Sequence, residues 1–365
     1  MELLVALFFG LVQGLTEFLP ISTGGHLALI QNVNQTIFGE ELFSPTLTFD
    51  ILLRFGTLMA IVFVFYSDIR GLWNALTACI KDIRNKEFSL RTEDPDRKLL
   101  YMLAVTALFL IPALFLTEYT GVYLNGLTVI ALMLLVSGIS NLFIDRIGVK
   151  ENTNAFFEQN FGTEGLVPDV AVSKAESEQT DAEKTEESEA DYIETAEAHA
   201  EVSVMVSVAE ALEEEICDSD NVEELTEGLE EDEPADESEP RFFLKQAATV
   251  GLFQLCSSIP GISRCSLTVL GGLVAGFRRD FTVKYAFLSA IPVLVVKILI
   301  QTVTVLIDGI RMNWLPYLLG MIAAFISGVF AIGWMRKSVR KYSCRRFGVY
   351  CLILGIIIFV IQLRG

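Results

Sequence analysis

The hydrophobic and polar positions of this chain alternate on the scale of whole segments. Apolar runs approaching 20 residues recur along it, and a helix of that length crosses a hydrocarbon layer of about 30 Å. The runs predict six membrane-spanning helices, at residues 46–66, 98–118, 122–144, 282–307, 314–334 and 346–363. Such a pattern is not that of a soluble globular enzyme.

Two further apolar stretches are interrupted by breaks rich in Pro, Gly and Ser. They are 2–19, with a break at 20–25 and a short apolar continuation at 27–33, and 242–258, with a break at 260–266 and a continuation at 267–277. Non-helical backbone at membrane depth is tolerated only where protein or a wet cavity surrounds it. We therefore expect both stretches to form re-entrant hairpins.

The two breaks resemble each other in sequence. Residues 10–13 (Gly-Leu-Val-Gln) recur as 251–254 (Gly-Leu-Phe-Gln), and each copy is followed by a proline and then by Ile-Ser. Each copy leads into three crossings, an odd number, so the second half must be inverted relative to the first. The predicted fold is an all-α integral membrane protein with two inverted-topology repeats, each a re-entrant hairpin plus three transmembrane helices.

Loop charge orients the predicted spans. Basic side chains gather in 67–97 and in 335–345, which places both loops in the cytoplasm. Counting crossings from there puts 145–241 on the cytoplasmic side as well, and both termini outside.

Charge also divides the chain into parts. Residues 151–240 carry 31 acidic and two basic side chains, a net −29, whereas the other 275 residues carry 15 acidic and 25 basic ones, a net +10. A self-repelling segment with little apolar surface does not fold by itself. We expect a first membrane repeat at 1–145, an acidic, disordered cytoplasmic insertion at 146–240 and a second membrane repeat at 241–365.

Composition excludes some kinds of site. The six cysteines form no CxxC pair, and the chain has only two histidines. Neither a zinc site nor a disulfide framework is therefore expected.

The first break carries two candidate groups. Glu17 lies in an otherwise apolar segment, four residues after Gln13, so both side chains share one helix face. An ionisable group at this depth is a functional candidate, although a carboxylate that reaches the interface is the alternative. His26 closes a Ser-Thr-Gly-Gly turn and could exchange protons, with a histidine at the water interface as the alternative.

The second break centres on Arg264, a lone arginine between two apolar arms. Its planar, permanently charged fork suits a phosphate group, and Gly261 lets backbone N–H groups approach the same ligand. The alternative is an internal salt bridge, with Glu17 as a candidate partner. A carboxylate, a histidine and hydroxyls facing an arginine indicate phosphoryl chemistry within the membrane.

Three more charged residues lie in the predicted spans. Asp50 and Arg54 are four residues apart on one helix face, so we expect them to neutralise each other; a supporting role for Arg54 at the site is the alternative. Lys297 could reach the interface or pair with a carboxylate.

Both breaks resemble signature motifs of one family. Residues 13–26 (QGLTEFLPISTGGH) resemble the pattern (E/Q)GLTEFLPxSSxGH, and 260–268 (PGISRCSLT) resemble PGxSRSxxT. Both patterns belong to the undecaprenyl-pyrophosphate phosphatases, also called bacitracin-resistance phosphatases, and the resemblance covers 1–145 and 241–365. It implies a multi-pass hydrolase of the bacterial plasma membrane that converts undecaprenyl diphosphate to undecaprenyl phosphate for cell-wall synthesis.

The resemblance also implies partners and roles. The implied substrate is a polyprenyl diphosphate lipid, and a divalent cation (Mg or Ca) is commonly required. No nucleic acid is expected as a partner, and a homodimer is one possible assembly. Glu17 becomes the principal catalytic carboxylate and the best metal candidate, His26 its acid/base partner, Thr23 a nucleophile and Arg264 the phosphate clamp. The expected phosphate-binding residues are Gln13, Ser22, Ser263, Ser266 and Thr268.

Three positions depart from the family pattern. Gln13 stands where many members have glutamate, which puts a direct metal role there in doubt. Thr23 replaces a serine but keeps a hydroxyl, and Cys265 replaces the serine after the arginine. The sequence therefore leaves open whether Thr23, Ser22 or a metal-bound water attacks phosphorus.

A carrier is the rival to an enzyme. Inverted repeats with paired hairpins are a common plan for alternating access, so a polyprenyl-phosphate or anion transporter or flippase fits the same fold. A carrier would need binding groups such as Arg264 but no acid/base groups beside hydroxyls.

Overall fold

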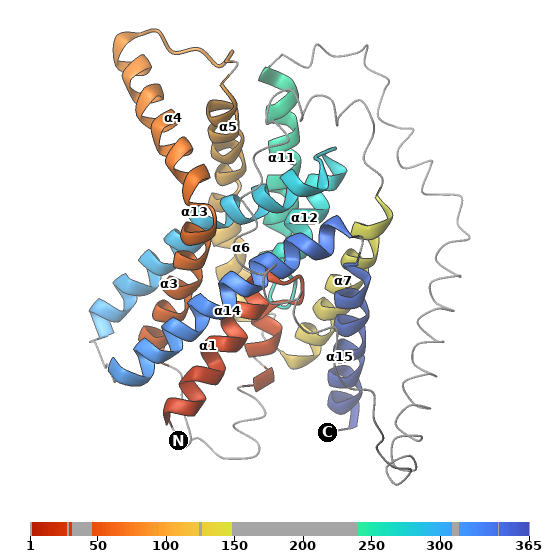
Figure 1. Ribbon diagram of the computed structural model, residues 1–365. Helices are drawn as coiled ribbons and strands as arrows, with labels where there is room; N and C mark the ends of the chain where they lie inside the picture. Colours follow the sequence, from red (N-terminus) through yellow and green to blue (C-terminus); the bar gives the residue numbers. More distant parts are fainter. Residues whose placement is uncertain are drawn as a thin grey trace, which may run out of the picture. The chain divides into compact units, whose positions relative to one another are not determined.

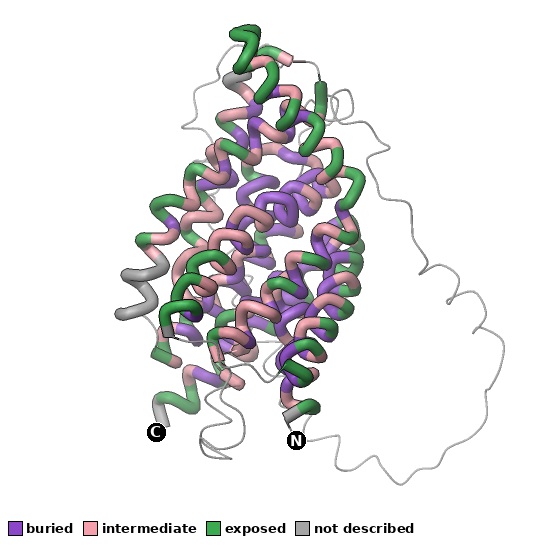
Figure 2. The backbone as a smooth tube through the Cα atoms, turned by 90° about the vertical axis from the view of Figure 1, so that its left-hand side faces the viewer, coloured by how far each residue is buried: buried purple, intermediate pink, exposed green. Residues whose placement is uncertain are grey.

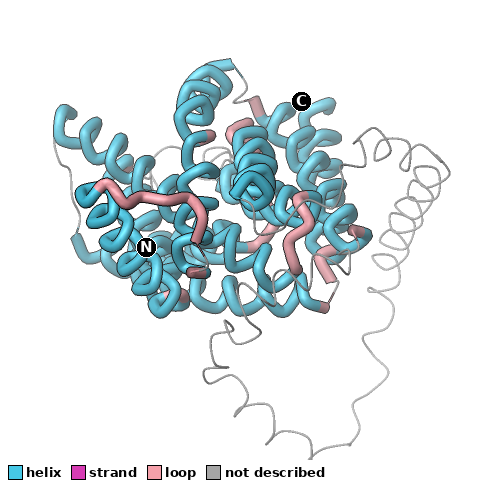
Figure 3. Tube along the Cα trace, turned by 90° about the horizontal axis from the view of Figure 1, so that it is seen from above, coloured by secondary structure: helices cyan, strands magenta, loops and turns pink. Residues whose placement is uncertain are grey.

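The computed structural model of the chain describes residues 2–27, 29–30, 46–92, 94–123, 126–147, 240–308, 314–341 and 343–364. The chain divides into two compact units, Met1–Thr163 with Glu237–Gly365, and Glu164–Asp236. The second unit, and the predicted insertion at 146–240 except for its two ends, lie outside the described residues. Within the described part every regular element is an α-helix (Figures 1 and 3).

Hydropathy predicted the spans correctly. Among the described residues, six helical segments are long and apolar enough to cross a membrane. Five of them are single helices: α3 (Leu47–Val64), α7 (Leu127–Arg146), α13 (Arg279–Asp308), α14 (Trp314–Arg340) and α15 (Arg345–Arg364). Helix α14 runs past the predicted end at 334, because its last turns carry basic side chains that favour a helix C-terminus.

The sixth span is interrupted. It consists of α5 (Pro95–Leu108) and α6 (Leu110–Tyr123), which are separated at Phe109. Pro112 explains the interruption, since a proline cannot donate to the residue four positions back and its ring crowds that carbonyl. The sequence predicted one continuous helix here.

Another helix was missed. The basic segment after α3, predicted as a loop, forms α4 (Tyr66–Asn85). It ends at Lys86, which adopts a left-handed conformation with φ 60°. Lysine is not a usual residue for that position, so no local signal marked the end of this helix.

Both expected breaks are present. Helix α1 (Glu2–Phe18) stops before Pro20, and helical residues resume at 23–27. Helix α11 (Pro240–Cys256) is followed by a non-helical stretch and by α12 (Arg264–Val274). The predicted second break, 260–266, was too long at its end, because Ser263 caps α12 and brings Arg264 into its first turn.

Small residues allow the helices of this unit to approach closely. Helix α14 packs against α1 and α3, α7 packs against α15, and α11 packs against α5 and α12. A side chain at Gly10 would overlap the carbonyl oxygen of Gly320, and one at Gly14 would overlap the hydroxyl of Ser327. Such contacts hold helices together in a lipid phase. Buried positions line the surfaces where the helices meet (Figure 2).

Candidate active site

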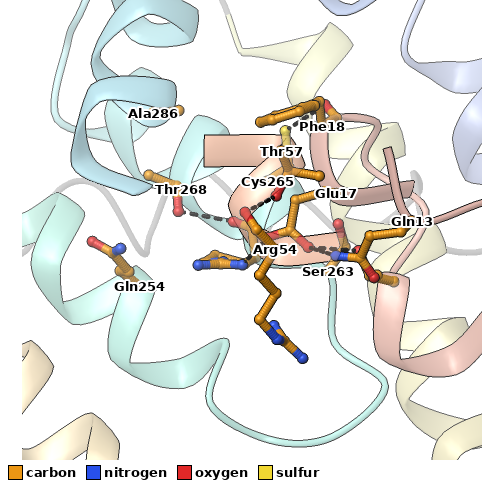
Figure 4. Close-up of polar contacts among 12 residues, drawn as sticks. Gln13, Glu17, Phe18, Arg54, Thr57, Gln254, Ser263, Cys265, Thr268 and Ala286 are labelled. Atoms are coloured by element: carbon orange, nitrogen blue, oxygen red, sulfur yellow. Dashed lines mark hydrogen bonds and ion pairs between the residues drawn. The ribbon is translucent and has the colours of Figure 1, made fainter. Parts of the chain in front are cut away.

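The side chain of Glu17 lies at the C-terminal end of α1 and is only 4% exposed. Gln13 Nε2 donates to Glu17 Oε2 at 3.1 Å, and Thr23 Oγ1 donates to the same oxygen at 3.3 Å. Arg264 Nη2 donates to the other oxygen, Oε1, and forms an ion pair with it. Residues of both breaks therefore meet at one carboxylate (Figure 4).

The Arg264–Glu17 ion pair is the alternative that the sequence left open, and it does not use the whole guanidinium group. Arg264 Nη1 is buried and has no hydrogen-bond partner among the described residues. A buried donor without a partner costs about 1–3 kcal/mol. The arrangement therefore leaves one charged donor beside Glu17 for an anionic ligand.

The hydroxyls of the second motif hold α12 in place. Ser263 Oγ accepts from Ser266 N at 3.3 Å and caps the helix, while Thr268 Oγ1 donates to the Arg264 carbonyl at 2.8 Å. Ser266 Oγ donates to Asn141 Oδ1 at 2.7 Å. Cys265 Sγ donates to the carbonyl of Phe18 at 3.1 Å, so its thiol contacts the backbone at the C-terminal end of α1. These contacts fix the direction in which Arg264 points.

Ser22 and His26 shape the first break. Ser22 has a positive φ of 65°, and its Oγ accepts from Gly25 N at 3.3 Å. His26 Nδ1 lies 2.8 Å from the Ser22 carbonyl and so donates to it, while Nε2 lies 2.7 Å from the Tyr350 hydroxyl. The described contacts join His26 to Tyr350 and not to Glu17.

Helix α7 forms hydrogen bonds with both breaks and holds them in place, a role that the sequence did not reveal. Asn141 Nδ2 donates to the Pro20 carbonyl at 2.6 Å, while its Oδ1 accepts from Ser266. Four residues earlier, Ser137 Oγ accepts from Ser263 N at 2.8 Å. The spacing of these polar residues in an apolar span was the available signal.

Arg54 and Lys297 join the same charged cluster. Arg54 Nε donates to Asp50 Oδ2 at 2.9 Å, which confirms the predicted pair. Arg54 also lies within electrostatic range of Glu17, and Lys297 lies within range of Glu17, Arg54, Arg264 and Asp50. Helices α1, α3, α12 and α13 thus each contribute a charge to one region.

A cavity of about 310 Å³ adjoins Arg54. Its lining is apolar except near the Asp50–Arg54 pair and Thr46, and consists of Phe9, Leu27, Thr46, Leu47, Phe49, Asp50, Leu53 and Arg54. The wall of the cavity therefore combines a charged pair with mostly apolar side chains.

A family model described as "Bacitracin resistance protein BacA" matches residues 6–166 and 196–357. The chain belongs to the BacA family. The match confirms the resemblance of the two motifs and, with the six apolar helices, makes the chain a multi-pass membrane protein. The residues between the two matched ranges, 167–195, lie inside the acidic segment.

Curated relatives align with the BacA-family chain from end to end. "Undecaprenyl-diphosphatase" of Methanobrevibacter smithii is 26% identical over 99% of this chain and 98% of its own length. The proteins of the same name from Halothermothrix orenii and from one Campylobacter jejuni strain are 24% and 25% identical, over 98% and 96% of their lengths.

The residues beside Glu17 fit a divalent cation in one limited way. No cluster of three His, Cys, Asp or Glu side chains occurs among the described residues. Gln13 Oε1, however, is buried beside Glu17 without a partner in the described part of the chain. Mg²⁺ is commonly held by one or two carboxylates together with substrate phosphates, so the Glu17 and Gln13 oxygens suit a cation that arrives with a phosphorylated substrate.

Proposed function

We propose that this BacA-family chain is a membrane phosphatase that hydrolyses undecaprenyl diphosphate to undecaprenyl phosphate and inorganic phosphate. The name shared by the end-to-end relatives supports this substrate. The observation that carries the proposal is the Arg264 Nη1 donor, which is buried beside Glu17 and has no partner among the residues that the structure describes. Its product would be the lipid carrier that cell-wall synthesis reuses.

Arg264 binds the terminal phosphate of the lipid. Its free Nη1 donates to a phosphate oxygen, and the N-terminus of α12 adds backbone N–H groups and the positive end of the helix dipole. Ser263, Ser266 and Thr268 keep this helix start in place through their hydrogen bonds. Their contribution to phosphate binding is therefore mainly through Arg264.

The attacking group gives its proton to Glu17. Thr23 Oγ1 donates to Glu17 Oε2, whereas Ser22 Oγ accepts from Gly25 N, so the geometry favours Thr23 over Ser22. Attack by Thr23 Oγ1 on the terminal phosphorus breaks the bond to the bridging oxygen, whose electron pair leaves with the lipid phosphate. Glu17 passes this proton to the departing lipid phosphate and so regains its base form. Water then attacks the phosphorus bound to Thr23 and gives a proton to Glu17, and Thr23 Oγ1 takes that proton back as its bond to phosphorus breaks and inorganic phosphate leaves.

His26 exchanges protons with water at the edge of the site. Its Nε2 bonds the hydroxyl of Tyr350, a residue that is 44% exposed. A divalent cation, Mg²⁺ or Ca²⁺, would be held by Glu17 and Gln13 and would neutralise part of the diphosphate charge.

We also infer that the membrane part consists of two inverted repeats, 1–145 and 241–365, on either side of the acidic segment 146–240. Exchanging the halves would turn the α1–α14 contact into an α11–α5 contact, and both contacts occur. The gap in the family match between 166 and 196 is consistent with this division.

Purified protein tests the proposal by phosphate release from undecaprenyl diphosphate in detergent. Arg264→Lys keeps the charge but loses the fork, so turnover should fall by about 100-fold while the fold survives. Near-parental turnover would contradict the clamp. A carrier would move polyprenyl phosphate between the leaflets of proteoliposomes without releasing phosphate. That result would show that the protein is a transporter and not a phosphatase.

A further inference from the structure

Two cations near the candidate site have no task in the reaction described above. The Arg54 side chain is 18% exposed, and Asp50 is its hydrogen-bonding partner among the described residues. Lys297 has no hydrogen bond or ion pair within the described part of the chain, although Glu17, Asp50 and two arginines lie within its electrostatic range. A diphosphate brings two phosphate groups, and Arg264 accounts for one.

The carboxylates nearby already have partners. Asp50 Oδ2 accepts from Arg54 Nε at 2.9 Å and from Gln301 Nε2 at 2.7 Å. Glu17 accepts from Gln13, Thr23 and Arg264.

Lys297 therefore requires a further anion if its charge is to persist. It lies inside α13, a helix apolar enough to cross the membrane. An ammonium group in such surroundings keeps its charge only beside an anion, and an ionisable group at this depth marks a functional site.

The cavity indicates where such an anion binds. Arg54 and Asp50 line it together with Phe9, Leu27 and Leu47. Its volume of about 310 Å³ is at the lower end of the usual range of ligand sites, about 300–1,000 Å³. A ligand with a phosphate at one end and a hydrocarbon at the other would match both its charged and its apolar walls.

We propose that the phosphate retained by the lipid binds between Arg54 and Lys297, and that the first isoprene units occupy the cavity beside Arg54. The inference rests on the proposed function, because it takes the terminal phosphate to lie at Arg264. When the bond to the bridging oxygen breaks, negative charge grows on the retained phosphate. Arg54 and Lys297 would stabilise that charge and so assist departure of the lipid phosphate.

Binding of a prenyl monophosphate tests the inference without any turnover. The probe is farnesyl monophosphate, and its dissociation constant is measured on full-length protein in detergent, beside that of inorganic phosphate. Lys297→Met should weaken farnesyl monophosphate binding about tenfold or more, the scale of a lost hydrogen bond to a charged group. Inorganic phosphate, held at Arg264, should bind within about twofold of the parent, and Lys297→Arg should restore farnesyl monophosphate binding.

A matched variant and a stability measurement separate binding from structure. Lys337→Met removes an exposed lysine of α14 and should change neither dissociation constant. Thermal unfolding of Lys297→Met should occur at the parental temperature or above, because the change removes a costly amine from an apolar span. A structural ion pair would instead make this variant less stable, and that outcome would overturn the proposal.

The Arg54 half of the site needs a paired change. Removing Arg54 alone would leave Asp50 without its partner, so Arg54→Gln is combined with Asp50→Asn. This double variant should also weaken farnesyl monophosphate binding by about tenfold. Unchanged binding in both the double variant and Lys297→Met would place the retained phosphate elsewhere.

The cavity half is tested by filling it. Leu47, in the first turn of α3, lines the cavity and is 37% exposed, so Leu47→Trp can fill space without disturbing the core. It should weaken farnesyl monophosphate binding and leave inorganic phosphate unaffected. Leu315→Trp, at a similarly exposed leucine in the first turn of α14, is the control. Equal effects of the two tryptophans would contradict the cavity assignment.

These outcomes are distinct from failure of the proposed function. One outcome is a parent protein that releases no phosphate from undecaprenyl diphosphate but loses prenyl monophosphate binding on Lys297→Met. It would support the proposed phosphate site and refute the phosphatase activity. The opposite outcome is an active parent whose Lys297→Met variant binds farnesyl monophosphate normally. It would support the phosphatase activity and refute the proposed site at Arg54 and Lys297.

Discussion

The carboxylate of Glu17 accepts from three side chains, Gln13 and Thr23 of the first motif and Arg264 of the second. A carboxylate held by this many donors is fixed in orientation, and the donors also restrain its basicity. A substrate phosphate that draws Arg264 towards itself would weaken one of these contacts. Glu17 would then become a better proton acceptor only when the substrate is bound.

Loss of the proton-accepting groups should reduce turnover strongly. Glu17→Gln keeps the shape of the side chain but cannot take a proton from Thr23, and His26→Ala removes the group that bonds Tyr350. Each should lower kcat for phosphate release by about 100-fold or more, the usual scale for general acid/base groups.

The control is another carboxylate-to-amide change far from this site. Asp82→Asn breaks the ion pair between Asp82 of α4 and Arg97 of α5. Because that pair is partly exposed, its loss should be small, with kcat within about threefold of the parent. Parental turnover in both Glu17→Gln and His26→Ala would refute the assignment of these groups.

At the scale of helices, the site depends on how two broken segments are held against α7. Asn141 donates to the carbonyl of Pro20 in one break and accepts from Ser266 in the other. Both contacts are buried, so their loss would leave polar groups without partners. The position of Arg264 relative to Glu17 therefore depends on a residue that touches neither.

Asn141→Leu should reveal this positioning role. Losing both hydrogen bonds would let the breaks shift, and small displacements of reacting groups are costly. We expect kcat to fall by about tenfold or more while KM changes little, and stability to fall by about 1–3 kcal/mol.

Ser140→Ala on the same helix is the control, since that hydroxyl donates to the Val136 carbonyl of α7 itself. Its kcat should be parental. Asn141→Asp keeps the acceptor for Ser266 and should retain more activity than Asn141→Leu. A loss of stability in Asn141→Leu without any loss of kcat would contradict a positioning role.

On the scale of the whole molecule, sequence reasoning predicted the spans and the motif residues, and it named Glu17 as one possible partner of Arg264, but it did not show which residues would meet at the site. Runs of apolar residues determine spans locally, and the two breaks carry their own Pro and Gly signals. By contrast, Arg264 reaches Glu17 across 247 positions of sequence. Lys297 and Arg54 converge through packing of α3 and α13, which no local pattern encodes. The role of Asn141 was not predicted, because the sequence does not show which groups an amide in a membrane span bonds.

The acidic segment gives a prediction for the chain as a whole. Both breaks belong to the unit formed by Met1–Thr163 and Glu237–Gly365, and loop length affects closure entropy only logarithmically. Replacing about 155–238 with a short Gly/Ser linker should leave phosphate release within roughly threefold of the parent, under about 1 kcal/mol in barrier.

Turnover of both proteins in the same detergent checks this, once folding is confirmed for each. A loss beyond about tenfold would show that the segment serves the site. Residues 196–239, which the family model also matches, would then be the first place to look.

Glu17 precedes the acidic segment in the sequence and Arg264 follows it, so the site is formed by both membrane parts together. The hydrogen bonds of Asn141 likewise connect the two. The substrate would act as an additional link, since its phosphates touch α3, α12 and α13 together. Two fragments made as separate polypeptides and divided within the acidic segment should therefore be inactive apart, reassemble when made together, and associate more tightly when the lipid diphosphate is present.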